Sequence, residues 1–395
     1  MSNADVFLVS AVRTAVARAR KGALANTLPV TYGAAAAAAA VERVSNLQRE
    51  QVDDVLMGCA MPEGEQGLNI ARQVSLHAGF PTSVPGATVN RFCASGLQTI
   101  AMAHGAIASG QAGVMVAGGT ESMSLLPMSG HYFVPDPQLA EVEPNVYISM
   151  GLTAERVASK YKVNRDDQDA FALQSHERAA AAIAEGRFVD EIVPMSVERQ
   201  ISLDGEVSIE SVEFKVDEGP RADSTLEALA KLRPAFAKRG TATAGNSSQM
   251  SDGAAAAVLM NRETMESLGA KPLARLAGFA LAGVEPDLMG IGPVEAIPKA
   301  LAQAGIALKD VELIELNEAF ASQALAVTRE LDLDPALVNV NGGAIALGHP
   351  LGCTGAKLTA TLLHEMGRRK QRWGLVSMCI GGGMGAAGVF ESLGE

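Results

Sequence analysis

The chain has 395 residues, 48% of them hydrophobic and 19% charged, which is long enough for a large core and for two core-forming units. Its net charge of −12, from 32 basic and 44 acidic side chains, disfavours nucleic acid and anionic membranes as partners, but not an anionic small ligand. The composition does not indicate disorder. Four widely spaced cysteines without a Cys-x-x-Cys pair argue against a disulfide scaffold or a zinc site, so we expect a reducing compartment and no bound metal.

Apolar strands and helices alternate in the first part of the chain. Val6–Val12, Asp54–Met57 and Val114–Ala117 are predicted strands, and Ala34–Val44 and Asn69–Ala78 are predicted helices. This alternation is typical of mainly parallel sheets covered by helices, so we expect an α/β fold.

The pattern changes between about Ser122 and Ser248, where charges and prolines are frequent and the strand–helix rhythm is lost. One amphipathic helix is predicted at Arg165–Glu185, with Asn164 as its N-cap. We interpret this segment as a long insertion that binds or covers something.

The alternation returns toward the C-terminus. The predicted strands are Leu273–Ala280, Val311–Leu316, Val338–Asn341 and Gly374–Met378, and the predicted helices are Pro293–Ala304, Glu318–Glu330 and Gly355–Gly367. Both parts share a strand, a Val-Asn pair, a small-residue turn, a helix and a strand ending in Gly-Gly. Any α/β protein looks repetitive at this level, but a reactive residue after Val-Asn in both parts favours an internal duplication.

Cys93 lies between a predicted strand that ends at Asn90 and a predicted helix that begins just after it. At a helix N-terminus, free N–H groups and the helix dipole lower a thiol's pKa, so Cys93 is a candidate nucleophile. A free cysteine can equally be a small buried hydrophobe, and this motif alone leaves both interpretations open.

His349 is the one histidine set among dense glycines, between Gly348 and Pro350. Such a locked imidazole is a candidate base or oxyanion donor. Cys379 follows another apolar strand and precedes Gly381-Gly382-Gly383. The spacing Gly383-x-Gly385-x-x-Gly388 also matches a dinucleotide fingerprint, but too little chain follows it for a βαβ unit, so we reject an NAD-binding oxidoreductase.

Asn317 follows a predicted strand and begins Asn-Glu-Ala-Phe. An amide there can hold a water or an oxyanion, although a helix N-cap explains the motif equally well.

Together these motifs resemble the thiolase family. Asn-x-x-Cys-x-Ser-Gly, Asn-Glu-Ala-Phe, Gly-His-Pro and Cys-x-Gly-Gly-Gly occur in this order, and further matches include Val116–Ser124, Met150–Glu155, Leu232–Phe236 and Ala244–Ser248. The resemblance covers essentially the whole chain. It implies a five-layered αβαβα fold of two duplicated halves with an inserted loop domain. We expect residues 1–121 with 249–270 to form the N-terminal half, 122–248 the inserted CoA-binding loop domain, and 271–395 the C-terminal half.

The resemblance also implies roles for five residues. Cys93 would attack the substrate carbonyl and become acylated, and His349 would accept its proton and donate to the thioester oxygen. Cys379 would shuttle the proton on the acetyl α-carbon. Asn317 would hold a water of the first oxyanion hole, and the N–H groups of Cys93 and Gly381 would form the second.

Coenzyme A would be a co-substrate, with no bound cofactor. The resemblance implies that seven residues contact CoA: Arg221, Ser248, Met150, Phe236, Met289, Ala319 and Phe320. For each Met or Phe among them, packing in the core is the simpler interpretation.

Gly348–Gly355 and Gly245–Asp252 resemble the degradative 3-ketoacyl-CoA thiolases. We therefore expect an acyltransferase that cleaves 3-ketoacyl-CoA in fatty-acid β-oxidation. A short-chain acetyl-CoA acetyltransferase is the near alternative. A condensing enzyme like the ketoacyl synthases would lack Cys379. A silent acyl-CoA-binding protein would have lost at least one of Cys93, His349 and Cys379.

The expected partners are acyl-CoA, CoA and further copies of the chain, as a homodimer or homotetramer. A β-oxidation multienzyme partner is a further expectation. Met1–Val9 lacks the features of a secretion signal, and Ala34–Val41 is too short to span a bilayer. Ser392–Glu395 is not a peroxisomal signal, so we expect a cytoplasmic protein.

Overall fold

A long mixed sheet organises the protein. The computed structural model describes residues 6–203 and 206–393, so the first five residues and the last two of the C-terminal tetrapeptide lie outside it. The strand order is β11-β12-β13-β10-β1-β9-β5-β3-β4. The bounds are β1 Val6–Thr14, β3 Asp54–Gly58, β4 Gly86–Val89, β5 Val114–Ser122, β9 Ser251–Asn261, β10 Ala274–Gly283, β11 Leu313–Leu316, β12 Trp373–Ile380 and β13 Met384–Ser392.

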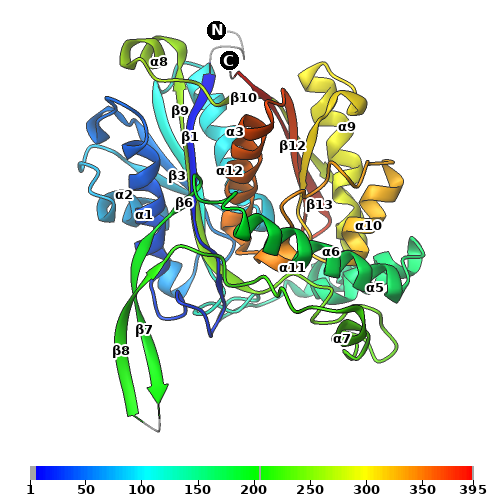
Figure 1. The fold of residues 1–395 in the computed structure, drawn as a ribbon. Coiled ribbons are helices and arrows are strands. Elements are labelled where there is room, and N and C mark those ends of the chain that lie inside the picture. The colour runs from blue at the N-terminus through cyan, green and yellow to red at the C-terminus, as the bar shows by residue number, and fades with distance from the viewer. Residues whose placement is uncertain (1–5, 204–205, 394–395) are drawn as a thin grey trace.

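The two halves of this sheet meet where β1 and β10 pair, at the single register pair Leu8 and Ala274. Figure 1 shows the five layers that result, with α1 (Pro29–Glu42) and α2 (Ile70–His77) outside one half. Helices α9 (Gly292–Ala304) and α10 (Ala321–Glu330) lie outside the other. The central layer is α3 (Ser95–Ala108) and α12 (Leu351–Arg369). The αβαβα architecture and the two halves expected from the sequence are confirmed.

The central helices approach closely because small residues face each other. A Cβ atom added to Gly355 would lie 2.3 Å from the backbone nitrogen of Leu97, and one added to Gly96 would lie 2.6 Å from that of Ala356. Since α3 follows Cys93 and α12 follows His349, this contact brings the starts of the two helices to one region of the molecule.

The segment between β5 and β9 contains a helical part and a hairpin. Helix α6 has its N-cap at Asn164, whose Oδ1 accepts the N–H of Asp167 at 2.8 Å, as predicted. The hairpin of β7 and β8 extends away from the layers (Figure 1). The bounds are α4 Pro137–Val142, α5 Met150–Lys160, α6 Arg165–Ala184, β6 Ile192–Val193, β7 Met195–Leu203, β8 Glu206–Phe214 and α7 Leu226–Ala230. The division of the chain at residues 121, 248 and 270 stays a prediction.

The expected mainly parallel sheet is wrong. Pairs β3–β4, β3–β5 and β11–β12 are parallel, but β9 and β13 pair antiparallel to both of their neighbours. The sequence did not suggest these two strands because they are rich in alanine and glycine, which have low strand propensity. The three-residue turn Gly381–Gly383 returns the chain directly from β12 to β13, and only antiparallel strands can be joined so tightly.

Val338–Asn341 is also not a strand. It makes one isolated parallel bridge, between Val338 and Ile314, and Asn339 then adopts a positive φ of 48° that ends the pairing. Among the described residues, no helix is long and apolar enough to cross a membrane.

Candidate active site

Cys93 lies in a tight elbow between β4 and α3. The preceding residue, Phe92, has a φ of +42°, a backbone conformation that is uncommon outside glycine and is often retained at functional sites. The N–H of Phe92 donates to Oδ1 of Asn90 at 2.9 Å, and the Ser95 hydroxyl donates to the Phe92 carbonyl at 2.7 Å. Cys93 therefore belongs to a 3-10 turn, Phe92–Ala94, ahead of the helix proper.

The pKa of Cys93 differs from the sequence-based expectation. Cys93 keeps partial exposure, yet surrounding protein atoms desolvate its sulfur, and this burial raises its pKa to about 12. The backbone N–H groups of Gly381 and of Cys93 itself donate to the sulfur and oppose the rise, whereas the Glu121 carboxylate adds to it. The expected net lowering at a helix N-terminus is thus wrong, because desolvation exceeds the effect of the N–H donors.

His349 lies at the start of α12 on a strongly constrained loop. Gly348 has a φ of +92°, and an added Cβ atom would lie 2.2 Å from the Ser251 hydroxyl, so only glycine fits there. The His349 N–H donates to the Gln249 carbonyl at 3.1 Å. Nδ1 of His349 lies 2.6 Å from the Thr354 hydroxyl, and Nε2 lies 3.4 Å from the Asn317 amide nitrogen. Both imidazole nitrogens thus have a polar neighbour.

The His349 imidazole is buried, and its pKa is lowered to about 3, first by burial and then by the Lys357 charge. It is therefore neutral near pH 7 and can accept a proton.

Cys379 and Asn317 lie at the ends of neighbouring strands. The Asn317 N–H donates to the Ser377 carbonyl at 2.9 Å, two residues before Cys379 on β12. Cys379 is fully buried, and its pKa is raised well above the usual value by burial and by the nearby Cys93. Oδ1 of Asn317 is buried and has no hydrogen-bond partner among the described residues, which suits an amide oxygen that accepts a hydrogen bond from a water.

Glu121, on β5, ties the cysteine side of this region to the histidine side. Its buried carboxylate accepts the N–H of Ala60 at 2.7 Å and, from the first turn of α12, the N–H of Gly352 at 2.7 Å. Cys93 and Leu351 pack in one apolar cluster beside this carboxylate. One buried anion thus joins segments from both halves of the chain.

Of the seven residues expected to contact CoA, five gather next to the cysteines. Met150, Met289, Ala319 and Phe320 pack with Cys379 in one cluster, and the rings of Phe236 and Phe320 meet edge to face at 5.8 Å. Ser248 is tied to this group, because its N–H donates to the Ala319 carbonyl at 3.0 Å.

Arg221 is set apart from this cluster. Its side chain is exposed, and its N–H donates to Nδ1 of His176 on α6 at 3.2 Å.

Two residues that surround His349, Thr354 and Lys357, received no role from the sequence. Thr354 lies within Gly348–Gly355, five residues after the histidine, and a hydroxyl at that spacing is the sequence signal that could have identified it. Lys357 is a lone cation in an otherwise apolar and small-residue stretch of α12, the usual mark of a buried charge.

The arrangement supports nucleophilic chemistry by a thiol. It combines Cys93, a neutral imidazole, a second buried thiol and two backbone N–H groups on the Cys93 sulfur. Among the described residues, no group of His, Cys, Asp and Glu side chains could hold a metal ion.

Comparisons with known proteins agree across the whole chain. The family model for "Thiolase, N-terminal domain" matches residues 6–263, and that for "Thiolase, C-terminal domain" matches residues 270–392. The chain is 55% identical to the "3-ketoacyl-CoA thiolase" of Bacillus subtilis, over 98% of this chain and 99% of that protein. It is 46% identical to the "Acetyl-CoA acetyltransferase" of Rhizobium meliloti, over the full length of both. The crystal structure of human mitochondrial 3-ketoacyl-CoA thiolase superposes with a TM-score of 0.88 at 41% identity, covering 98% of this chain and 99% of that one.

Proposed function

Since this chain belongs to the thiolase family, we propose that it is an acyltransferase that cleaves 3-ketoacyl-CoA with CoA, giving acetyl-CoA and a shortened acyl-CoA. The observation that carries this proposal is the convergence on the Cys93 sulfur of the N–H groups of Gly381 and Cys93, with Cys379 beside it. In this proposal the same N–H groups would also receive the thioester oxygen as charge develops on it, and losing one such donor typically costs about 2.7–4 kcal/mol of barrier.

In the first half-reaction, Cys93 attacks the 3-keto carbon as its proton passes to His349. The bond between the α-carbon and the former keto carbon then breaks. The resulting enolate of acetyl-CoA takes a proton from the Cys379 thiol, and acetyl-CoA leaves an acyl group on Cys93.

In the second half-reaction, the Cys379 thiolate takes the proton of the CoA thiol. The CoA sulfur attacks the acyl-Cys93 thioester, and Cys93 leaves and recovers its proton from His349. Both thiols and the imidazole are then in their starting protonation states. A neutral His349 and a protonated Cys379 suit this sequence of proton transfers.

Coenzyme A binding is supported by the apolar cluster and by nearby charge. Met150, Met289, Phe236 and Phe320 offer an apolar wall for a pantetheine chain. Residues 221–239, which follow β8 and are mostly exposed, carry five cations and two acidic residues on a chain of net charge −12, which favours phosphate groups. The cations are Arg221, Lys231, Arg233, Lys238 and Arg239.

A 3-ketoacyl-CoA substrate is favoured over acetoacetyl-CoA synthesis by the higher identity to the relative named for that activity, 55% against 46%. Because the chemistry is reversible, acetyl-CoA acetyltransferase activity is the second candidate, and a place in fatty-acid β-oxidation follows from the first. A silent acyl-CoA-binding protein is the alternative of another class.

The proposed oligomer is a homodimer or homotetramer. Strand β4 ends the sheet and pairs only with β3 among the described strands, so its outer edge is free to pair. Leu68 lies beside β4, because the side-chain amide of the next residue, Asn69, donates to the Gly86 carbonyl at 2.7 Å. The Leu68 side chain is 95% exposed. We also propose a cytoplasmic location, although some relatives are named peroxisomal. Membership of a β-oxidation multienzyme complex is an extension of the same proposal.

The test follows the absorbance of the magnesium–3-ketoacyl-CoA enolate in the presence of free CoA, with acetoacetyl-CoA and a long-chain substrate in parallel. Wild type should consume the substrate and Cys93→Ser should not. Preference for the long chain supports the degradative function, and preference for acetoacetyl-CoA supports the second candidate. If wild type consumes neither substrate but binds both, the silent binding protein is the better description.

A further inference from the structure

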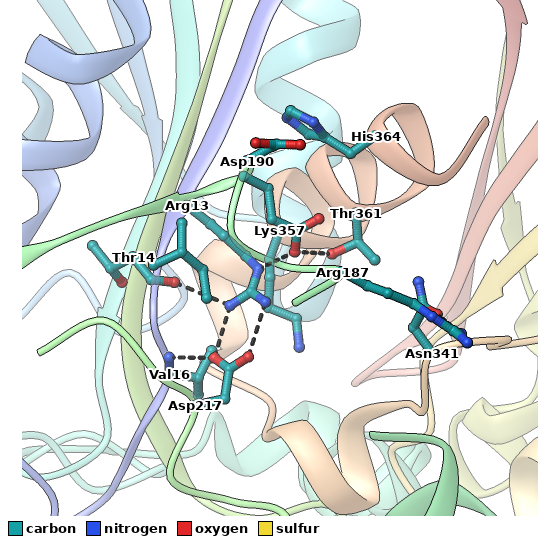
Figure 2. Close-up of polar contacts among 12 residues, drawn as sticks. Arg13, Thr14, Val16, Arg187, Asp190, Asp217, Asn341, Lys357, Thr361 and His364 are labelled. Carbon is teal, nitrogen blue, oxygen red and sulfur yellow. Dashed lines mark hydrogen bonds and ion pairs between the residues drawn. The ribbon is translucent and has the colours of Figure 1, made fainter. Parts of the chain in front are cut away.

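A buried charged cluster is connected to the His349 loop through Lys357, which donates to the Gly348 carbonyl. Arg13 on β1 is at its centre, and its guanidinium donates to both oxygens of Asp217 at 2.7 and 2.9 Å and also pairs with Glu191 (Figure 2). Thr361 on α12 donates to the Glu191 carboxylate at 2.8 Å. All of these side chains are buried, so the cluster joins the inserted segment, β1 and α12 away from water.

Lys357 is the second cation of this cluster and has a different kind of partner. Its side chain is 2% exposed, and its ammonium group donates to the Gly348 carbonyl at 3.0 Å. Burial and the Arg13 charge lower the pKa of Lys357 from its usual value. The charged or titratable groups that face it are Arg13 on β1, Asp217 after β8, Glu315 on β11, Glu318 before α10, His349 before α12 and Cys353 on α12. Lys357 thus donates a hydrogen bond to the backbone of the histidine loop rather than to a carboxylate.

The Gly348 carbonyl belongs to the peptide group that connects directly to His349. Gly348 has a φ of +92° and a ψ of 160°, a conformation that rotates this peptide group out of the preceding short helix, α11 (Ala344–Leu347). The N–H of the same peptide group, that of His349, donates to the Gln249 carbonyl. Lys357 and Gln249 therefore hold the two sides of one peptide plane, and the direction of the His349 side chain follows from that plane.

We propose that Lys357 is a positioning residue for His349: its side-chain amino group holds the Gly348 carbonyl through a hydrogen bond and, when protonated, places a positive charge beside the imidazole. This inference rests on the proposed function, in which His349 acts as a neutral base. The charge of Lys357 opposes a second charge on His349 and adds to the effect of burial on its pKa. Among the described residues, Lys357 is the charged group that shifts the pKa of His349.

The test compares three variants of the full-length protein. Lys357→Met removes the charge and the donor at similar length, Lys357→Arg keeps both, and Thr361→Val disturbs the same cluster one turn along α12 without touching the histidine loop. Two quantities are measured for each: kcat and KM for thiolysis, and the pH titration of His349 by NMR with ¹³C-labelled histidine, its signal assigned with His349→Asn.

For Lys357→Met we expect kcat to fall by about 100-fold with little change in KM for CoA, because misplacement of a catalytic group by about 1 Å has that effect. Its His349 should titrate at higher pH than in wild type, since the repelling charge is gone. Lys357→Arg should recover most of kcat. Thr361→Val should lose stability but keep the wild-type kcat and the wild-type titration.

Two results would overturn the inference: an unchanged His349 titration and kcat in Lys357→Met, or an equal loss of kcat in Thr361→Val. If Lys357→Met does not fold, Lys357→Met/Glu315→Gln takes its place, because it removes one cation and one acid together. The NMR titration needs no acyl-CoA. A wild type without thiolysis would therefore count against the proposed function, whereas normal thiolysis in a folded Lys357→Met would count against this inference alone.

Discussion

Nδ1 of His349 lies 2.6 Å from the hydroxyl oxygen of Thr354, and that hydroxyl donates its one hydrogen to the Pro350 carbonyl at 2.9 Å. Thr354 can therefore only accept from His349, so Nδ1 carries the hydrogen and Nε2 is the free, basic nitrogen. Nε2 is also the nitrogen that faces Asn317. One hydroxyl thus selects the tautomer that proton transfer from Cys93 requires.

The variant Thr354→Val should lower kcat for thiolysis by about 10- to 100-fold. Loss of the group that orients a histidine side chain has an effect of this size at metal sites. Thr354→Ser keeps the hydroxyl and is the matched control, with kcat within a few-fold of wild type. Steady-state kinetics with both variants decide the matter. Equal activity of the Val and Ser variants would show that the hydroxyl does not set the tautomer.

Two substitutions at Gly381 differ in whether the backbone N–H is kept. Gly381→Pro deletes the N–H that points at the Cys93 sulfur, and we expect kcat to fall by about 100- to 1000-fold. Gly381→Ala keeps the N–H, and its Cβ atom would lie 3.4 Å from the Met150 sulfur, an ordinary contact. The two variants are compared in the thiolysis assay after circular dichroism has shown that both fold, and a similar small effect of both would exclude the donor role.

The raised pKa of Cys93 predicts how the resting enzyme reacts with iodoacetamide. Because the thiolate is a minor species well below pH 12, the rate of alkylation at Cys93 should rise steadily from pH 7 to pH 10 without a plateau. Mass spectrometry of the Cys93 peptide gives the rate, and Cys93→Ser supplies the blank. A plateau below pH 8 would mean that the N–H donors outweigh burial after all.

Glu315 makes stability depend on pH. Burial raises its pKa to about 8, and its Oε1 atom has no hydrogen-bond partner within the part of the chain that the structure describes. The folded state thus holds the Glu315 proton more tightly than the unfolded state does. The stabilisation that results is complete below the unfolded pKa of about 4.5 and is lost as the pH rises toward 8.

Glu315→Gln cannot lose that proton, so relative to wild type its free energy of unfolding should increase between pH 5 and pH 8 by at most about 3 kcal/mol. Urea titrations of both proteins at these two pH values measure the difference. Parallel pH dependence of the two would show that Glu315 is not the group responsible.

The proposed oligomer predicts an effect of charge beside the free edge strand. Leu68→Glu places a carboxylate at an exposed site next to β4, so the fold should be retained while the dimer weakens at least tenfold. Sedimentation velocity at several concentrations measures this, with Val189→Glu as a control at an exposed site elsewhere. An identical assembly state for wild type and Leu68→Glu would place the interface away from Leu68.

Much of the fold could be predicted because its signals are local. The apolar strands β1, β3 and β5, the helices α1 and α6, and the Asn164 cap all follow from residues that are near one another in the chain. The strands β9 and β13 could not be predicted, because alanine and glycine have low strand propensity. Their backbones are extended because neighbours on both sides supply hydrogen bonds.

By itself, the sequence singled out Cys93, Asn317, His349 and Cys379 as candidate side chains, because each stands at or near the end of a predicted strand or among small residues that are neighbours in the chain. Only the tertiary structure decided how those groups are tuned. Burial raises the pKa of Cys93 against the expected effect of its helix, Thr354 selects the tautomer of His349, and burial together with Lys357 lowers the pKa of His349. The reason is physical: desolvation and charge act through space between atoms from distant segments, and no local pattern encodes which segments meet.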